Sequence, residues 1–535
     1  MRDRRRHGRN PIVVVAESVW CAGGLVVVTT ALALLVFNRS HVVAAAACES
    51  LTSLSLPNTT ITLAESVGSG HFTPPATGRG APAPYSELPA FCRVALTTKP
   101  TTDSNIKIEV WMPAGWNGKF NAVGTGGWAG SIGYAQLRDA LKRGYATSST
   151  DTGHVGGNGL FALEHPEQYI DWGYRSEHEM TVTAKAIIAA FYGNPPRYAY
   201  WDGCSNGGRQ GLQEAQRFPN DFDGIIAGAP VLNFTGTMLQ YVHAAKALKA
   251  GPLPAAKLPT LAAKIYDSCD AKDGLKDGLI DDPRRCDFQP ARDLPKCDAG
   301  ADRPDCFTAP QIGTLEKIYA EVQSNGKKVF PFRPVSAEAA GQNGRSAWEA
   351  WTVNDARPPA GIVFAETFLR YLAFPKPDPQ YELTAFDFDK DMAKLDNIHQ
   401  ILDATDTDLT RFRQHGGKLI MYFGWADPAL NPMMGVEYYE AVQQRMGPST
   451  TDFFRLFMVP GMLHCGDGPG PNSFDNVAPL TAWVEKGTAP DSILATKVTD
   501  GKPARTRPLC VYPQVARYKG AGSTDEAANF ACVKP

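Results

Sequence analysis

A glycine-rich pentapeptide between a strand pattern and a helix pattern limits the folds open to this chain. Residues 198–201 read as a short buried strand and residues 207–217 as a helix. Between them lies Gly203-Cys204-Ser205-Asn206-Gly207, which matches the G-x-S-x-G nucleophile elbow. The elbow is a strained turn in which neighbouring backbone segments approach closely, so small residues are needed on both sides of the serine. A glycine-rich turn without a catalytic role could have the same sequence, but the position between a strand and a helix favours a nucleophile.

Strand and helix patterns alternate on both sides of this elbow. Residues 106–112 alternate apolar and polar side chains, as a half-buried strand does. The alternation of strands and helices is lost from Val231 to Gln414 and then returns, with strand patterns at 419–423 and 453–459. Such alternation predicts a parallel sheet with helices on both faces. We therefore predict an α/β-hydrolase fold whose catalytic domain comprises residues 48–230 and 415–535, with residues 231–414 inserted as a lid domain between nucleophile and acid.

The N-terminal segment has the three parts of a secretory signal peptide. Five arginines between residues 2 and 9 form a basic head, residues 22–37 are apolar, and alanines at 44–47 follow. A membrane anchor is one alternative, but the apolar run is short for a span. Lipid attachment at Cys48 is another. We predict that residues 1–47 are a signal peptide, that the mature protein is secreted or periplasmic, and that no stable membrane span remains.

The cysteines support export. Cys21 lies in the predicted signal, and the other ten are an even set, which in an exported chain indicates a disulfide framework. Zinc is a weak alternative because no CxxC pair occurs. Short spacings suggest three local pairs, although sequence alone does not determine the connectivity. The three close pairs are Cys269 with Cys286, Cys297 with Cys306, and Cys510 with Cys532, and the others are Cys48, Cys92, Cys204 and Cys465.

A serine nucleophile needs a general base and an orienting acid. In an α/β-hydrolase the acid and then the histidine follow the serine, each on a loop after a strand. Asp427 follows the strand pattern at 419–423, and His464 follows the one at 453–459. Both therefore stand where the architecture requires them. Residues that fit this order less well are Asp151, Asp202, His154, His178 and His243.

Two cysteines flank these candidate catalytic residues. Cys204 directly precedes the predicted nucleophile, and Cys465 directly follows the predicted base. If serine and histidine meet in space, so do the two cysteines, and a disulfide there would restrain the catalytic geometry. Cys48 would then remain for Cys92.

Ester cleavage passes through an oxyanion that backbone N–H groups must stabilise. The N–H of Asn206, directly after the nucleophile, is one expected donor. The other is expected from the glycine-rich loop at residues 121–130, where we favour Gly127 over Gly126.

An acidic loop in the insertion suggests a calcium site. Asp270, Asp273 and Asp277 recur around turn glycines, and carboxylate and carbonyl oxygens are the ligands that Ca²⁺ prefers. Leu275 and Leu279 are placed to add backbone carbonyls. The spacing is not that of an EF-hand, and a solvated acidic turn is an equally good interpretation.

Together these motifs resemble the tannase and feruloyl esterase family, which includes bacterial terephthalate half-ester hydrolases. The resemblance covers nearly the whole mature chain. One departure is Ala429, where many members carry leucine; here Leu430 comes one place later. The matching segments are residues 203–208, 273–279, 368–374, 386–391, 424–427 and 461–465.

The resemblance implies roles for specific residues. Ser205, Asp427 and His464 would form the catalytic triad, with Cys204 and Cys465 joined by a disulfide. The ligands of a structural calcium would be Asp270, Asp273, Leu275, Asp277 and Leu279. Aromatic residues of the predicted lid would either sandwich an aromatic acyl group or form the core of the lid. Arg370 could bind a substrate carboxylate, but a structural ion pair is the better interpretation. These aromatics are Trp348, Trp351, Phe364, Phe368 and Tyr371.

The expected function is hydrolysis of carboxylic esters of aromatic, phenolic acids by a secreted serine esterase. The substrate would be a small-molecule or plant-polymer ester. Alternatives are a terephthalate half-ester, a general short-chain ester and, from another class, a non-catalytic exported binding protein. The formal net charge of −2 gives no reason to expect a nucleic-acid partner, which would need a basic face.

Overall fold

The computed structural model describes residues 46–76, 82–338 and 347–535. Residues 44–535 form one compact unit. The predicted signal peptide, residues 1–47, lies almost entirely outside the described residues. Within the described ranges, no helix has both the length and the apolar character needed to cross a membrane.

A nine-stranded sheet forms the centre of this unit, in the order β1-β2-β3-β5-β4-β6-β7-β10-β11. Neighbours from β5 to β11 run parallel, while β1, β2, β3 and β5 pair antiparallel. The bounds are β1 (Thr59–Val67), β2 (Phe91–Thr98), β3 (Ile106–Pro113), β4 (Lys119–Val123), β5 (Ala146–Thr150), β6 (Tyr198–Cys204), β7 (Gly224–Gly228), β10 (Lys418–Gly424) and β11 (Phe454–Val459).

This is the predicted α/β-hydrolase fold, with one correction. The sheet is mixed rather than wholly parallel, because β1, β2 and β3 follow one another without an intervening α-helix. Parallel neighbours need a crossover, usually a helix, whereas antiparallel ones need only a loop. The half-buried strand predicted at 106–112 is wrong: only Lys107 of β3 is exposed, because Ile106, Ile108, Val110 and Met112 lie in the largest core cluster and Trp111 packs in the cluster on the other face.

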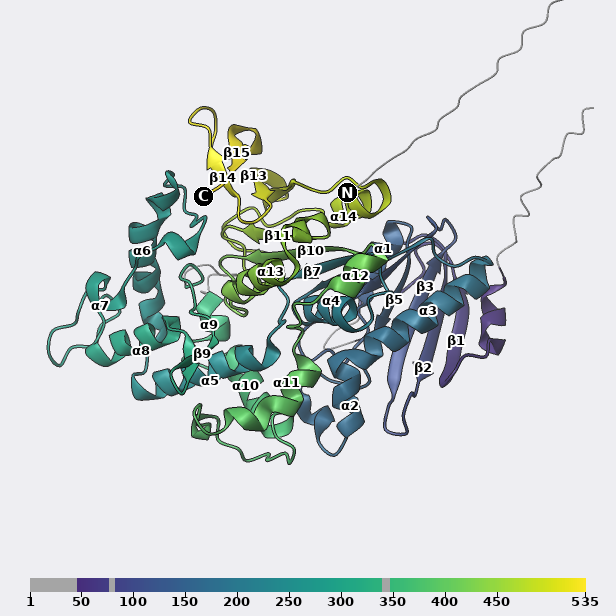
Figure 1. Cartoon of the computed structure of the whole chain (residues 1–535), viewed down its shortest axis with the longest axis horizontal. Coiled ribbons are helices and arrows are strands. Elements are labelled where there is room, and N and C mark those ends of the chain that lie inside the picture. Colours follow the sequence, from purple (N-terminus) through teal and green to yellow (C-terminus); the bar gives the residue numbers. More distant parts are fainter. Residues whose placement is uncertain (1–45, 77–81, 339–346) are drawn as a thin grey trace, which may run out of the picture. The chain divides into compact units, whose positions relative to one another are not determined.

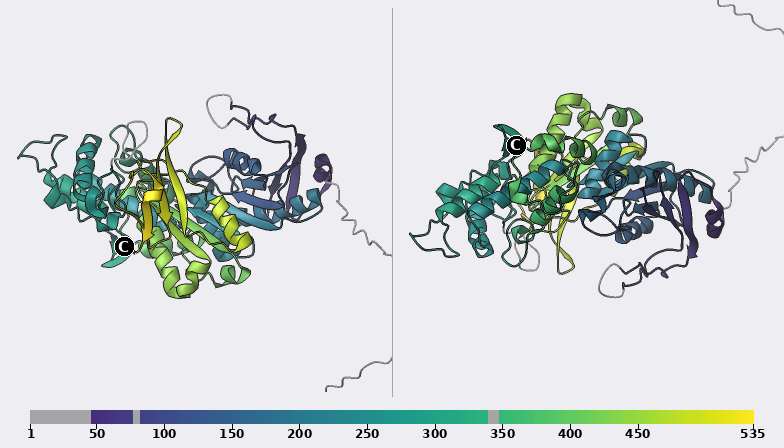
Figure 2. Two further views of the ribbon diagram at one scale, coloured as in Figure 1. Left: turned by 90° about the horizontal axis from the view of Figure 1, so that it is seen from above. Right: turned by 90° about the horizontal axis from the view of Figure 1, so that it is seen from below.

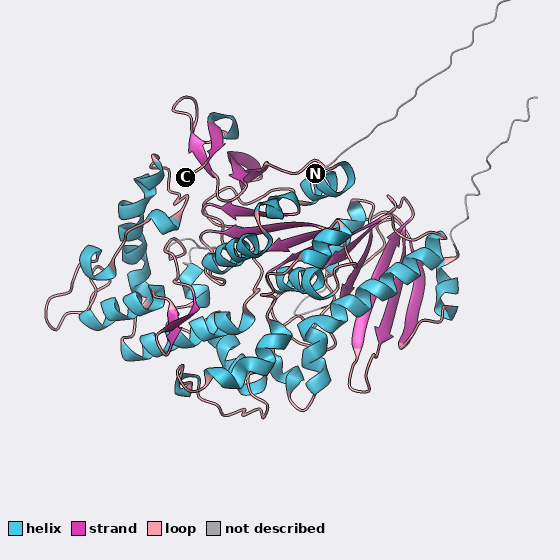
Figure 3. Ribbon diagram, in the orientation of Figure 1, coloured by secondary structure: helices cyan, strands magenta, loops and turns pink. Residues whose placement is uncertain are grey.

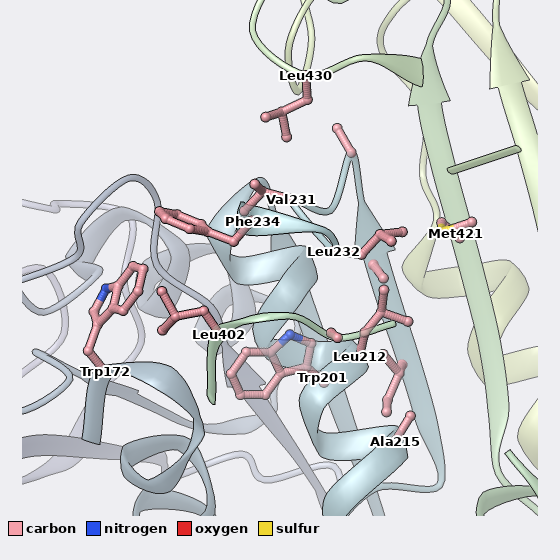
Figure 4. Packing of buried hydrophobic residues seen from close by; sticks show 14 of the residues in the cluster. Trp172, Trp201, Leu212, Ala215, Val231, Leu232, Phe234, Leu402, Met421 and Leu430 are labelled. Carbon is pink, nitrogen blue, oxygen red and sulfur yellow. The ribbon is translucent and has the colours of Figure 1, made fainter. Parts of the chain in front are cut away.

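Helices cover both faces of the sheet (Figures 1 and 3). In Figure 1, α3, α4 and α13 lie over the face turned to the viewer, and the buried side chains between them and the sheet form the largest core cluster. Figure 4 shows part of this core around α4. The opposite face packs against α1 and α14. The bounds are α1 (Tyr134–Lys142), α2 (Pro166–Ile170), α3 (Ser176–Tyr192), α4 (Asn206–Arg217), α13 (Pro432–Met446) and α14 (Val477–Lys486).

The described residues of the segment 231–414 add helices and one small hairpin but no strand to the nine-stranded sheet. The views in Figure 2 show these helices, in teal and green. Its separation from the catalytic region as a lid domain stays a prediction. The bounds are α5 (Phe234–Ala250), α6 (Leu258–Cys269), α7 (Pro290–Asp293), α8 (Ala309–Tyr319), β8 (Val322–Ser324), β9 (Lys327–Phe330), α9 (Ala347–Trp351), α10 (Ala360–Tyr371), α11 (Asp396–Leu402) and α12 (Thr410–His415).

The C-terminal residues form two small antiparallel sheets, β12–β13 and β14–β15. They comprise β12 (Ser492–Thr499), β13 (Lys502–Cys510), β14 (Val515–Tyr518) and β15 (Phe530–Val533). The predicted disulfide framework is present. Its five bonds are Cys48–Cys92, Cys204–Cys465, Cys269–Cys286, Cys297–Cys306 and Cys510–Cys532.

Candidate active site

Ser205 occupies the sharp turn between β6 and α4. Its backbone has φ 64° and ψ −123°, a conformation that non-glycine residues rarely adopt. Its N–H donates to Gly228 O at 2.9 Å, which ties the turn to the neighbouring strand β7. A Cβ on Gly203 would lie 2.5 Å from Gly207 O, so glycine is required there. The turn therefore has the strain and the close backbone approach of a nucleophile elbow.

The three residues predicted as a triad meet in space. Ser205 Oγ lies 2.9 Å from His464 Nε2, and His464 Nδ1 lies 2.8 Å from Asp427 Oδ2. With Nδ1–H donating to the carboxylate, Nε2 is left to accept the serine hydroxyl proton. This is the hydrogen-bonded chain needed to activate a serine.

Asp427 is held rigidly beneath the histidine. Its side chain is fully buried, and Oδ1 accepts the backbone N–H groups of Ala429 and Leu430, each at 2.9 Å. Because one oxygen is fixed by the backbone, the other is directed at His464. The departure from the family pattern at position 429 leaves these bonds intact.

The competing candidates serve other purposes. Asp151 accepts backbone N–H groups from Lys107 and Gly153, both at 2.9 Å. His154 stacks on Phe161 with ring centroids 3.8 Å apart, and burial lowers its pKa to about 4. His178 bonds Asp221, and His243 bonds Lys317 O. Of the five alternatives, only Asp202 lines the cavity that contains Ser205.

The Cys204–Cys465 disulfide adjoins both catalytic side chains. Its Cα atoms are 5.9 Å apart, and it joins residues 261 positions apart in the sequence. It links the residue before the nucleophile to the residue after the base. The end of β6 and the loop after β11 are thereby covalently connected at the site.

Backbone donors for an oxyanion surround Ser205. Asn206 is the first residue of α4, so its N–H has no partner within the helix. Gly126 and Gly127 both line the cavity, and Gly127 has a left-handed φ of 58°. The position of the loop alone therefore does not distinguish the two glycines.

One positioning residue was not anticipated from the sequence. Gln210, on the first turns of α4, accepts the N–H of Thr125 at 3.0 Å and donates to Thr125 Oγ1 at 3.2 Å. It thereby fixes the glycine-rich loop relative to the elbow. Its spacing of five residues after Ser205 carries no signal that would reveal this contact.

A cavity of about 620 Å³ opens at Ser205 and His464. One part of its wall is apolar and comes mainly from the segment 231–414, above all from α5; we call it the aromatic lobe. The helical spacing of its α5 members, at i, i+4 and i+7, could have identified that face as a wall. The aromatic lobe comprises Val231, Phe234, Met238, Tyr241, Trp351, Phe364 and Leu430.

Only two of the five suggested lid aromatics line this cavity. The Trp351 ring lies 5.9 Å from the His464 ring and 6.1 Å from that of Phe364. Trp348 and Phe368 are fully buried in two different core clusters, and Tyr371 lines a separate cavity. Arg370 Nε donates to Tyr381 O and its guanidinium faces Glu366, so it is engaged within the segment 231–414.

The acidic loop is shaped by its own carboxylates. Asp270 Oδ1 accepts the N–H groups of Asp277 and Gly278, at 3.2 and 3.1 Å. Asp273 Oδ1 accepts the N–H of Leu275 at 2.8 Å. Across the loop, Asp277 Oδ2 meets the Arg507 guanidinium of β13 at 2.9 Å.

A fourth carboxylate lies at the same place and was not expected. Burial, together with the charge of Asp273, raises the pKa of Asp281. The loop also touches the active site indirectly. A Cβ on Gly461, three residues before His464, would lie 2.7 Å from Leu279 Cδ2, so buried Leu279 packs directly on the histidine loop.

Known proteins resemble this chain along most of its length. The family model described as tannase and feruloyl esterase matches residues 92–533. An uncharacterised esterase of Xanthomonas campestris is 39% identical over 540 residues, covering 92% of each chain. Mono(2-hydroxyethyl) terephthalate hydrolase of Piscinibacter sakaiensis is 36% identical, covering 85% of this chain and 87% of its own. The crystal structure of feruloyl esterase B from Aspergillus oryzae superposes with a TM-score of 0.82 at 29% identity, covering 91% of this chain and 99% of its own.

Proposed function

Because the chain belongs to the tannase and feruloyl esterase family and is a carboxylic ester hydrolase, we propose that it cleaves esters of aromatic, phenolic acids through a Ser205 acyl-enzyme. The observation that carries this proposal is the hydrogen-bonded Ser205–His464–Asp427 chain at the mouth of the aromatic lobe. The planar rings of this lobe can stack on an aromatic acyl group as well as make apolar contacts with it.

The proposed reaction has two halves. Ser205 Oγ attacks the ester carbonyl carbon while His464 Nε2 takes the hydroxyl proton, and Asp427 stabilises the resulting imidazolium. The N–H groups of Asn206 and Gly127 would hold the oxyanion. The proton then passes to the leaving alcohol oxygen. Water, deprotonated by the same histidine, hydrolyses the acyl-enzyme and releases the acid.

The half-ester of terephthalate is the second candidate substrate, suggested by the relative from Piscinibacter sakaiensis. A half-ester carries a carboxylate, which calls for a cation in the acyl pocket. Among the described residues that line the cavity, the only arginine or lysine is Arg143, which pairs with Asp475, and Arg370 is bonded within the segment 231–414. A neutral phenolic acyl group therefore suits these residues better.

The substrate proposal predicts a ranking of esters. We expect kcat/KM to be higher for methyl ferulate or methyl gallate than for p-nitrophenyl acetate after correction for intrinsic reactivity, and higher than for mono(2-hydroxyethyl) terephthalate. Phe364→Ala should lower kcat/KM for the phenolic esters about tenfold or more, because truncating an aromatic that contacts a ligand costs on the order of 1.5 kcal/mol or more. Initial rates over this panel measure both effects.

The neighbouring Val363 provides the matched control, since its side chain is exposed on the same helix and lies outside the cavity. Val363→Ala should leave the ranking unchanged. A wild-type preference for the terephthalate half-ester would contradict the phenolic assignment and favour the second candidate.

We further propose that the acidic loop binds a structural Ca²⁺ through Asp270, Asp273 and Asp277 and the carbonyl groups of Leu275 and Leu279. Support comes from the donor set, which consists of oxygen atoms only and is gathered in one short loop flanked by the Cys269–Cys286 disulfide. Arg507 offsets part of the negative charge at Asp277. The ion would stabilise the loop on which Gly461 rests.

Chelation tests this calcium proposal. Removing Ca²⁺ with EGTA should lower Tm by about 3–10 °C, because a ligand bound only by the folded state stabilises it. CaCl₂ should restore Tm where MgCl₂ does not. Asp273→Asn should lower Tm by itself and abolish the response to EGTA. Metal analysis that finds no calcium, with Tm unchanged by EGTA, would refute the proposal.

The place of action is proposed to be outside the cytoplasm, secreted or periplasmic. Five disulfide bonds support this, because they persist in oxidising compartments.

A further inference from the structure

A histidine and two carboxylates meet at the end of α4 that is opposite to Ser205. His178 belongs to α3, Glu214 to the last turn of α4, and Asp221 to the loop between α4 and β7. The two helices lie side by side over one face of the sheet (Figure 1). One nitrogen of the histidine and one oxygen of each carboxylate all lie within 4.8 Å of one another. No step of the proposed reaction uses this group.

Glu214 is buried without a hydrogen-bond donor. The residue is 1% exposed, and neither of its carboxylate oxygens has a hydrogen-bond partner among the described residues. It also stands in the last turn of its helix, where the helix dipole disfavours a negative charge. A buried carboxylate in such a position is costly unless a proton or a cation neutralises it.

The surroundings of Glu214 add to this cost. Burial, together with the charges of Asp221 and Glu177, raises the pKa of Glu214 well above its ordinary value. The ammonium group of Lys185 opposes this shift, but it donates to the backbone oxygen of Asp221 and forms no hydrogen bond to Glu214. The described residues therefore leave room for a further cation between the two carboxylates.

His178 completes the group. Its Nδ1 lies 2.6 Å from Asp221 Oδ2, and its ring stacks on that of Phe218 with centroids 3.9 Å apart. These two contacts hold the imidazole beside the carboxylates, much as carboxylates orient histidines that bind metals. The side chain of His178 is 32% exposed, so an ion can reach the group from solvent.

We propose that His178, Glu214 and Asp221 bind a transition-metal dication, with Zn²⁺ as the preferred ion. Imidazole nitrogen and carboxylate oxygen are both zinc ligands, whereas Ca²⁺ and Mg²⁺ prefer oxygen ligands alone. Zinc lies about 2.0–2.2 Å from such ligands, so ligand atoms around one ion stand about 3–4 Å apart. Small rotations of the three side chains reach this spacing, and solvent beside His178 supplies the fourth ligand.

The ion would have a structural role. It would connect α3 to the C-terminal end of α4, the helix that begins directly after Ser205. It would also supply the positive charge that Glu214 lacks. The competing arrangement is a proton on Glu214, shared with Asp221, which would leave no place for a metal.

Equilibrium dialysis against ZnCl₂ distinguishes the two arrangements. Protein without a purification tag would be stripped with chelator and dialysed in excess CaCl₂, which keeps zinc from the acidic loop. Wild type should bind one more Zn²⁺ per chain than Glu214→Gln, which keeps the shape of the side chain but removes its charge. His178→Gln should lose the same ion. Zinc affinity should fall at least about tenfold in each variant, since loss of a residue that only supports a metal ligand already costs about 10–100-fold.

Thermal unfolding gives a second measurement. ZnCl₂ should raise Tm of wild type by about 2–5 °C, because the ion binds only the folded state, and should leave Tm of both variants unchanged. MgCl₂ should not replace ZnCl₂ in this experiment.

His165→Gln is the matched control. His165 also pairs with an aspartate, Asp103, at 2.7 Å, but no third His, Cys, Asp or Glu of the described residues completes a group there. This variant should keep the zinc content and the Tm response of wild type.

Equal zinc content in wild type and His178→Gln would overturn the proposal, and so would loss of zinc in His165→Gln. The remaining explanation would then be a proton on Glu214. Because His178 is partly exposed, His178→Gln tests the site even if Glu214→Gln fails to fold.

Discussion

Ser205→Ala is expected to lower kcat by about 10⁴- to 10⁶-fold for every ester that the enzyme cleaves. The alanine has no nucleophilic oxygen, so His464 has no proton to accept and no acyl-enzyme forms. Oxyanion donors and the cavity remain, which is why residual catalysis above the uncatalysed rate is expected. Stopped assays at high enzyme concentration measure the residual rate.

The same variant separates an enzyme from a binding protein that merely retains the fold. A fluorophosphonate probe should label wild type and fail to label Ser205→Ala, while Tm stays close to that of wild type. Near-wild-type turnover in Ser205→Ala, or labelling at another serine, would refute the assignment of the nucleophile.

Loss of the Cys204–Cys465 bond has the second largest expected effect. In a Cys204→Ser/Cys465→Ser double variant, the free energy of unfolding should fall by about 2–5 kcal/mol, because the bond closes a loop of 261 residues in the unfolded chain. Turnover should also fall, since the Ser205–His464 distance loses its covalent restraint and small misplacements slow catalysis steeply. Denaturant unfolding and kcat measure the two effects.

Cys510–Cys532 provides a control for disulfide loss in general. It closes only 22 residues and lies in the small C-terminal sheets rather than in the cavity wall. A Cys510→Ser/Cys532→Ser variant should lose less stability than the first variant and keep wild-type kcat. If both double variants keep wild-type kcat, the bond beside the triad stabilises the fold without positioning the catalytic residues.

The sequence predicted the meeting of Ser205, Asp427 and His464 because the fold imposes an order on them. Each follows a strand that can be recognised from its run of apolar residues. Parallel strands bring their C-terminal ends to one edge of a sheet, so residues that follow them lie close together. The antiparallel pairing of β1, β2 and β3 was harder to predict. The pattern of apolar residues in a strand indicates which side chains are buried, but not which strand lies next to it in the sheet.

The walls of the cavity were only partly predictable. Trp348 and Phe368 are aromatic residues of the same segment as Trp351 and Phe364, and the sequence does not distinguish the two pairs. The first two are fully buried and the last two line the cavity. The difference depends on which side of each helix faces the core, and that is decided by tertiary packing. Asp202 illustrates the same limit. It was considered as a catalytic acid and set aside by chain order, and only the structure places it in the wall of the cavity at Ser205.

The 261-residue span of the Cys204–Cys465 bond also determines what proteolysis can do to this enzyme. Residues 204–465 form a covalent ring that contains the whole segment 231–414. A protease that cuts once inside this ring opens it but releases no fragment, because both pieces stay joined through the sulfur atoms beside the triad. On a denaturing gel such a nicked enzyme migrates as one species without reductant and as two with it. Cleavage of the lid segment can thus go unnoticed in a non-reducing preparation, with the two halves of the active site still held together.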